Sequence, residues 1–130
     1  KRIVREARRR FGRLDALVNS AANFRPAVPP HVSERDWDDH LDLNLKGCFF
    51  LAQEAAKAMR RGGAIVQITD ANRDWKRYAA YGISKAGAEA MVRVLKRSLG
   101  PRIRVSAVAP GHVRFPEGAR RVAAAVLRKL

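Results

Sequence analysis

The chain has 130 residues, so we expect residues 1–130 to form a single domain. Its only cysteine, Cys48, excludes an internal disulfide framework, and the sequence contains neither a cationic leader nor an apolar run of membrane-spanning length; we expect a soluble, cytoplasmic protein without a metal site. The net charge of +15 at pH 7 comes from short, scattered arginine clusters without interleaved aromatic residues, which favours solvated helix faces over a nucleic-acid surface.

The first half of the chain alternates helix, strand and helix. Residues 1–11 are predicted to form a basic helix, which leads into an apolar run at 14–21 that is bounded by turn formers, as a buried strand is. Prolines keep residues 24–31 from forming a helix. A capping box opened by Ser33 then begins a long helix, expected over residues 33–62.

The second half repeats this alternation. Residues 63–69 and 103–111 are further short runs rich in Val, Ile and Ala, and they flank a helix expected over 79–99. The tail from Glu117 is predicted to form one more helix. The apolar faces of the two long helices are expected at Leu41, Leu45, Phe49, Ala52 and Ala56, and at Ile83, Gly87, Ala90, Val94 and Ser98.

This order of elements predicts an α/β fold, in which a parallel sheet has right-handed crossovers and helices that cover both faces of its strands. Ligands of such sheets bind beyond the carboxyl ends of the strands. The polar and turn residues expected at that edge are Asn19, Thr69, Asp70, Tyr81, Lys85, Pro110 and Gly111.

Tyr81 and Lys85 are four residues apart at the start of the predicted helix 79–99, so they share one helix face. A free tyrosine has a pKa of about 10. A positive charge about 5 Å away, at an effective dielectric of about 20, contributes roughly 3 kcal/mol, or about two pKa units. We therefore expect Lys85 to lower the pKa of Tyr81 enough for proton exchange near neutral pH. Taken alone, the pair is equally compatible with a helix surface that has no function.

Five motifs occur in order along the chain: "DALVNSAA", "LDLNLKG", "GAIVQITD", "YGISK" and "IRVSAVAPG". Together they resemble the short-chain dehydrogenase/reductase family, from about residue 11 to residue 116. The resemblance implies a partial Rossmann-type, doubly wound parallel sheet and a nicotinamide dinucleotide cofactor, NADP or NAD, with NADP favoured. It also implies hydride transfer to the carbonyl or imine of a small molecule, and assembly into a homo-oligomer.

The same resemblance implies a role for each motif position. Tyr81 corresponds to the family's proton donor, and Lys85 to the lysine that lowers the pKa of that tyrosine and binds the nicotinamide ribose. Asn44 corresponds to the asparagine that anchors a water in the proton path. Cofactor contacts are implied for Asn19, Ala21, Lys85, Pro110, Gly111 and Val113.

Asp70 departs from the family's usual pattern. Most members end the middle strand with two serines, the second of which orients the substrate oxygen, whereas this chain has Thr69 and Asp70. An aspartate there resembles the pteridine reductase-like branch, as do "NSAA" and "APGHVRFPE", and this implies a pteridine-like substrate with Asp70 in the catalytic set. A turn cap is the alternative role for Asp70. The segment from Asp70 to Tyr81 is also shorter than is usual in the family.

The glycine-rich phosphate-binding turn of the family is not found in this sequence. No Gly-x-x-x-Gly-x-Gly pattern follows a predicted strand, so the pyrophosphate would lack its backbone cradle. We therefore expect a fragment, the C-terminal catalytic portion of a reductase, that is inactive by itself. Two alternatives stay open: a catalytically inactive remnant that acts by oligomerising, and a basic module that binds nucleic acid.

Overall fold

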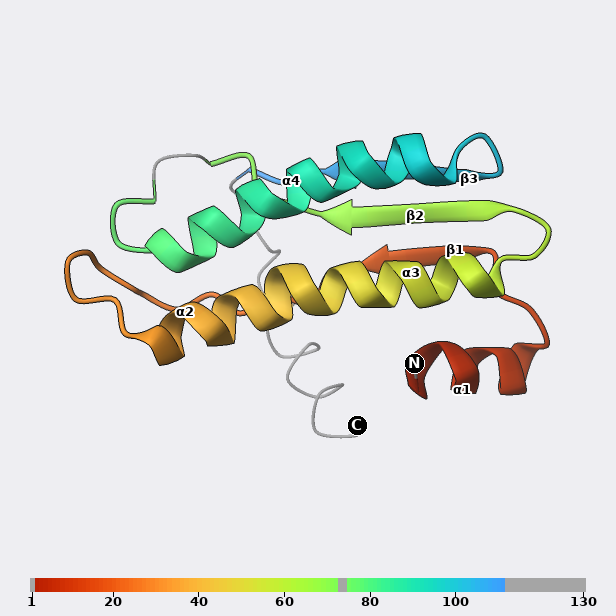
Figure 1. Ribbon diagram of the computed structural model, residues 1–130, viewed down its shortest axis with the longest axis horizontal. Helices are drawn as coiled ribbons and strands as arrows, with labels where there is room; N and C mark the ends of the chain where they lie inside the picture. The colour runs from red at the N-terminus through yellow and green to blue at the C-terminus, as the bar shows by residue number, and fades with distance from the viewer. Residues whose placement is uncertain (1, 73–74, 112–130) are drawn as a thin grey trace, which may run out of the picture.

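Helices and strands alternate along the described part of the chain, residues 2–72 and 75–111 of a computed structural model (Figure 1). In chain order the elements are α1 (Arg2–Phe11), β1 (Ala16–Asn19), α2 (Glu34–Leu41), the π-helical segment η1 (Asp42–Gly47), α3 (Cys48–Ala58), β2 (Gly63–Ile68), α4 (Ala79–Leu99) and β3 (Ile103–Val108). This alternation confirms the expected order of elements. The tail helix expected from Glu117 lies outside the described residues.

The three strands form one parallel sheet in the order β1-β2-β3. Leu17 of β1 pairs with Ile65 of β2, which pairs in turn with Val105 of β3. Because the strands all run the same way, their carboxyl ends meet at one edge, and Figure 1 shows α2 and the start of α4 beyond that edge. The predicted α/β fold, a partial Rossmann-type parallel sheet with flanking helices, is confirmed.

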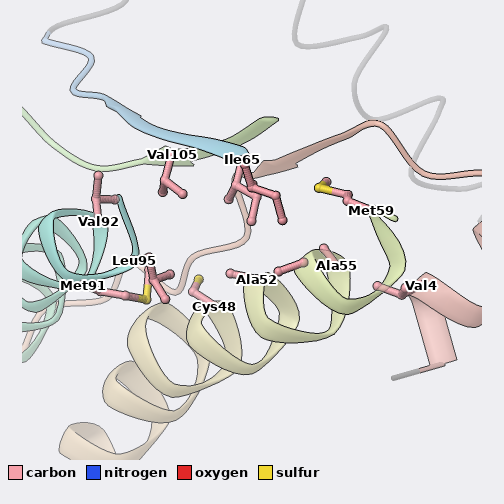
Figure 2. Close-up of a cluster of buried hydrophobic side chains, with 12 residues drawn as sticks. Val4, Cys48, Ala52, Ala55, Met59, Ile65, Met91, Val92, Leu95 and Val105 are labelled. Carbon is pink, nitrogen blue, oxygen red and sulfur yellow. The ribbon is translucent and has the colours of Figure 1, made fainter. Parts of the chain in front are cut away.

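One face of the sheet carries the hydrophobic core. Figure 2 shows Ile65 and Val105 on the sheet side of the cluster, and Ala52 of α3 and Leu95 of α4 on the helix side. Val4 of α1 joins the cluster at one end. Each large apolar side chain buried there contributes about 1.5–3 kcal/mol relative to exposure. This packing holds α3 and α4 against the sheet and so fixes the start of α4 near the strand ends.

In the described part of the chain, the opposite face of the sheet is open. Strand register places Val18 and Val108 on it, and these side chains are 63 % and 51 % exposed. The sequence predicts strands that are covered on both faces, and this expectation is wrong for the described structure. The reason is that the helices packed on the strands, α3 and α4, both lie on the core face. Within the described residues, β1 also pairs on one side only, with β2.

The helix expected over residues 33–62 is interrupted and ends early, with α3. Ser33 caps α2 as the capping box predicts, but η1 is a π-helical segment, whose wider turn rotates the following residues around the helix axis. A Cβ on Gly47 would lie 3.0 Å from the carbonyl oxygen of Asp42, so glycine suits this turn. Asn44, inside the π-helical segment, faces inward and is 1 % exposed.

The buried face of α4 is not the one that its apolar periodicity predicts. Ile83 and Val94, expected to be buried, are 49 % and 58 % exposed. The buried residues are Ala80, Tyr81, Ser84, Lys85, Ala88, Met91, Val92 and Leu95. Polar side chains occupy the first two turns of this face because they are hydrogen-bonded inside the protein, and a pattern built on apolar residues therefore selects the wrong face.

Some of the basic side chains form ion pairs on the surface. On α1, Glu6 lies 2.8 Å from Arg9 and 2.6 Å from Arg10, and all three side chains are exposed. Exposed pairs of this kind contribute little to stability. No helix in the described part of the chain is long and apolar enough to cross a membrane.

The open sheet face and the unpaired side of β1 lead us to expect that the purified 130-residue chain self-associates. Sedimentation velocity at micromolar concentration should detect oligomers or aggregates. Val18→Lys should raise the monomer fraction, because a charge on this face opposes its burial against another chain. Val28→Lys is the matched control, since Val28 is 43 % exposed but lies in a loop. A parent chain that sediments as a single monomer would contradict this expectation.

Candidate functional site

Two polar side chains meet beyond the carboxyl end of β2. Asp70 follows this strand, and Tyr81 lies in the first turn of α4. The Tyr81 hydroxyl donates a hydrogen bond of 2.6 Å to Oδ2 of Asp70, while Oδ1 of Asp70 accepts the backbone N–H of Asn72 at 2.8 Å. One carboxylate oxygen therefore caps the turn, as the alternative role for Asp70 requires, and the other holds the tyrosine.

Lys85 lies one turn after Tyr81 on the buried face of α4. Its Nζ donates a hydrogen bond of 3.0 Å to the carbonyl oxygen of Ile68, at the end of β2, and lies 5.6 Å from the centre of the Tyr81 ring. Burial is the main influence on this ammonium, and it lowers the pKa of Lys85. The Ile68 carbonyl uses one of the three donors of an ammonium group, which leaves Lys85 able to donate to a ligand.

The pKa of Tyr81 moves in the direction opposite to the one expected from its spacing to Lys85. Burial of the phenol is the largest cause, followed by its hydrogen bond to Asp70 and by the negative charge of that carboxylate, and all three raise the pKa. The Lys85 ammonium donates to the strand end instead of to the phenol oxygen. The expected lowering is therefore wrong for this structure, and Tyr81 stays protonated to higher pH than a free tyrosine.

The buried amide of Asn44 joins three segments of the chain. Its Oδ1 accepts the backbone N–H of Asn23 at 2.6 Å, and its Nδ2 donates to the Asn23 carbonyl at 2.9 Å and to Oγ of Ser84 at 3.0 Å. Ser84 Oγ donates in turn to the carbonyl of Tyr81 at 2.7 Å. Asn44 thus positions the turn that carries Tyr81. The role in anchoring a water, implied by the family resemblance, stays a prediction.

Two aromatic rings contact Tyr81 and a third stacks on one of them, and none of the three is identified from the sequence. Phe24 contacts the Tyr81 ring edge to face with ring centres 4.7 Å apart, and Trp75 does so at 5.6 Å. Tyr78 stacks on Phe24 at 4.5 Å. An isolated bridge between Ala27 and Tyr78 holds the two loops together. The sequence shows only that both loops contain aromatic residues. It does not show that these rings contact one another, because that contact depends on the bridge between the loops.

Two of the expected cofactor residues lie beside α3, away from Tyr81. Asn19 is buried, and its Nδ2 donates to the carbonyl of Cys48 at 3.3 Å. Ala21 is exposed. Both line a cavity of about 430 Å³, whose lining includes Cys48 and Leu43 but not Tyr81. The structure therefore brings Tyr81, Lys85, Asp70 and Asn44 into one network and places Asn19 and Ala21 outside it.

The remaining expected cofactor residues follow β3. The carbonyl of Pro110 accepts the backbone N–H of Ala71 at 3.0 Å, which joins the end of β3 to the loop of Asp70. Gly111 comes next and is exposed. Val113 lies outside the described residues. Pro110 is thus held next to the loop that carries Asp70.

The described residues fit one end of a nicotinamide dinucleotide. Lys85 has donors for ribose hydroxyls beside the Tyr81 proton, as a hydride-transfer site requires. The described glycines with positive φ, Gly12 and Gly62, precede β1 and β2 and so lie at the edge opposite to Tyr81. Within residues 2–72 and 75–111, no glycine turn leads from a strand into a helix N-terminus, so these residues do not supply a cradle for the pyrophosphate.

A family model described as enoyl-(acyl carrier protein) reductase matches residues 1–129, and the chain belongs to the short-chain dehydrogenase/reductase family. The 3-oxoacyl-[acyl-carrier-protein] reductase FabG of Thermotoga maritima is 37 % identical to it over 124 residues, which are 89 % of this chain and 49 % of that protein. The chain therefore spans about half the length of the curated relatives that it matches.

Solved structures show the same likeness. A putative short-chain alcohol dehydrogenase from Sinorhizobium meliloti superposes with a TM-score of 0.82 at 36 % identity, covering 87 % of this chain and 47 % of that one. FolM alternative dihydrofolate reductase 1 from Brucella canis, complexed with NADP, superposes with a TM-score of 0.79 at 34 % identity, covering 95 % and 52 %. These likenesses confirm an oxidoreductase family with a Rossmann-type sheet.

The hydrogen bond between Tyr81 and Asp70 leads us to expect that Asp70→Asn lowers the pKa of Tyr81. The substitution removes a negative charge beside the phenol and so makes the phenolate easier to form, while burial, the larger cause, still holds the pKa up. An NMR titration of the tyrosine Cζ signals measures the change, and Tyr78→Phe assigns the two tyrosines. Equal midpoints for Tyr81 in the parent and in Asp70→Asn would show that the carboxylate has no such influence.

Proposed function

We propose that residues 1–130 are the catalytic portion of an NADP-linked reductase that adds hydride to a carbonyl or imine, with Tyr81 as the proton donor. The observation that carries this proposal is the hydrogen bond of 2.6 Å between Tyr81 and Asp70, which lies beside Lys85 at the carboxyl edge of the sheet. Relatives named as reductases and dehydrogenases support the type of reaction. The FolM structure, complexed with NADP, supports the choice of cofactor.

Tyr81 supplies the proton that completes the reduction. A reduced nicotinamide would supply the hydride to the carbon of the C=O or C=N bond, whose π electrons then move to the oxygen or nitrogen. Tyr81 gives its phenolic proton to that atom, so one O–H bond breaks and a new O–H or N–H bond forms. Lys85, buried near the ring, offsets the negative charge left on the phenol oxygen. Asp70 has one of two roles: it orients the substrate atom, or it relays a proton from solvent to Tyr81.

The other residues of the site bind and orient. Asn44 holds the turn of Tyr81 through Ser84 and, by the family resemblance, anchors a water on the proton path. Lys85 would hold the ribose hydroxyls of a bound nicotinamide dinucleotide. The further cofactor contacts that we propose are Asn19, Ala21, Pro110, Gly111 and Val113. Because the described residues contain no pyrophosphate cradle, we propose that residues 1–130 alone are inactive.

We propose a pteridine-like substrate, a flat ring system that contains a C=N bond. Three observations support it. Asp70 replaces the serine that most of the family has. The rings of Phe24 and Trp75 contact the proton donor, and Tyr78 stacks on Phe24. A structure named as an alternative dihydrofolate reductase superposes on 95 % of the chain. Aromatic rings gain from offset or edge-to-face contact with a flat ring, which suits such a substrate.

A second candidate function is assembly with other copies or with intact relatives, without catalysis. The exposed apolar side chains of α3 and α4 favour it, because Phe50, Ile83 and Val94 are 52 %, 49 % and 58 % exposed. A homo-oligomer formed through these helices is also compatible with the reductase. Activity of a complete protein that contains residues 1–130 distinguishes the two functions.

Tyr81→Phe in the complete protein should reduce NADPH-dependent turnover by about 10²–10⁴-fold, the usual contribution of a positioned acid. The ring and its aromatic contacts remain, so the melting temperature and the Kd for NADPH should change little, and both serve as controls. Steady-state kinetics with a pteridine-like substrate measure the loss. A variant that keeps turnover within about tenfold of the parent would exclude Tyr81 as the proton donor.

Asp70→Ser should keep part of the turnover, because serine is what most of the family has at this position, whereas Asp70→Ala should lose nearly all of it. The reason is that serine still offers a hydroxyl to orient the substrate atom, and alanine offers no polar group. Comparing kcat with the melting temperature separates catalysis from capping. If Asp70→Ala lowers only the melting temperature and leaves kcat unchanged, Asp70 serves as the turn cap alone.

A further inference from the structure

A cavity of about 390 Å³ lies at the amino edge of the sheet, opposite to Tyr81. Three segments line it: the end of α1, the loop that leads into β1, and the end of α3 with the loop into β2. Figure 1 shows these segments at the end of the sheet away from α2. The volume is within the range of small-molecule sites, about 300–1,000 Å³. A ligand bound here would therefore occupy a second site, away from the candidate reductase site.

Four arginines that are scattered along the sequence line this cavity: Arg8, Arg13, Arg60 and Arg61. All four residues are exposed, so solvent and ligands can reach them. Arg13 is paired with Asp15, whose Oδ1 lies 2.6 Å from Nη2 of the arginine. In the described part of the chain, the other three guanidinium groups form neither an ion pair nor a hydrogen bond. The fold thus gathers separate basic clusters around one cavity and leaves three cations without a described counter-ion.

Capping of the neighbouring helix ends does not explain these arginines. Basic side chains often bind the last carbonyls of a helix, but other groups already do so here. At the end of α1, the carbonyl of Arg8 accepts the N–H of Gly12 at 2.8 Å. After α3, the carbonyl of Met59 accepts the N–H of Gly62 at 3.1 Å and Nη1 of Arg102 at 2.9 Å. The three unpaired guanidinium groups therefore remain free to bind an anion.

An exposed aromatic ring borders the same cavity. Phe11, the last residue of α1, lines it and is 76 % exposed. Leu14 and Ala58, both half-buried, add apolar surface to the lining. Guanidinium groups bind phosphate through paired N–H donors, and an exposed ring offers a face on which a flat base can stack. The lining therefore matches a ligand that carries both phosphate groups and an aromatic ring.

We propose that this cavity is a binding site for a nucleoside phosphate, whose base stacks on Phe11 and whose phosphates lie between Arg8, Arg60 and Arg61. The limited volume favours a single nucleotide over a nucleic-acid strand, which needs a longer track of positive charge and further stacking rings. The site is separate from the reductase site, because it lies at the opposite edge of the sheet and uses other residues.

Equilibrium dialysis of the 130-residue chain against ATP tests the proposal, with EDTA present to remove metal ions and with about 0.15 M salt. Salt at this concentration screens the attraction between ATP and isolated surface charges. The parent chain should bind ATP more tightly than it binds adenosine, which lacks the phosphates, or tripolyphosphate, which lacks the ring. Dialysis measures this binding even if the chain self-associates.

Three variants separate a built site from general charge. Arg60→Ala/Arg61→Ala should weaken the binding of ATP and of tripolyphosphate about tenfold or more, because it removes charge-assisted hydrogen bonds. Arg93→Ala/Arg97→Ala is the matched control, since it removes the same charge from exposed positions on α4 and should bind ATP as the parent does. Phe11→Leu should weaken ATP binding about fivefold and leave tripolyphosphate binding unchanged, because only base stacking is lost.

Equal losses of ATP affinity in the two double variants would show that net charge alone attracts the nucleotide, and would overturn the proposal. An absence of ATP binding, or an ATP affinity that Phe11→Leu leaves unchanged, would overturn it as well. A parent chain that binds oligouridylate but not ATP would have a nucleic-acid surface in place of a nucleotide site. Dialysis involves no hydride transfer, so failure of this proposal and failure of the proposed reductase function are distinguishable.

Discussion

Parallel pairing of β1, β2 and β3 is the constraint on which the candidate site depends. Because the strands end at the same edge, the loops that carry Phe24, Asp70 and Pro110 leave the sheet at that edge. The buried amide of Asn44 then links the first of these loops to α4, through its bonds to Asn23 and Ser84. The position of Tyr81 therefore depends on two constraints. The backbone hydrogen bonds of the sheet align the strand ends, and the side chain of Asn44 ties the loop to α4.

Burial of the phenol and the nearby Asp70 carboxylate both raise the pKa of Tyr81 and so favour its protonated form. Asp70 Oδ2 is 2.6 Å from the hydroxyl oxygen, whereas Lys85 Nζ is 5.6 Å from the ring centre and donates to the carbonyl of Ile68. The carboxylate therefore adds to the effect of burial, which is the largest cause of the raised pKa of Tyr81. Tyr81 is thereby kept in its neutral form, which is the form that gives a proton during reduction.

Much of the fold can be predicted from the sequence, because apolar runs bounded by turn formers report buried parallel strands directly. The proximity of Tyr81 and Lys85 can also be predicted, since it needs only the repeat of one helix. The buried face of α4 cannot, because Ser84 and Lys85 are polar and their burial depends on partners elsewhere in the chain. The raised pKa of Tyr81 cannot be predicted either. The helical spacing places Lys85 near Tyr81, but it does not show that Asp70, from the preceding loop, bonds to the same hydroxyl. The π-helical turn at Asn44 likewise has no signal in apolar periodicity.

A crystal structure of the complete protein with NADP and a pteridine-like inhibitor tests the role of Tyr81 most directly. We expect the Tyr81 hydroxyl to have left Asp70 and to lie about 2.6–3.2 Å from the inhibitor atom that would receive the proton, with Lys85 donating to the nicotinamide ribose. A complex in which Tyr81 stays bonded to Asp70 and the inhibitor binds beyond hydrogen-bond reach of its hydroxyl would contradict the assignment of Tyr81 as the proton donor.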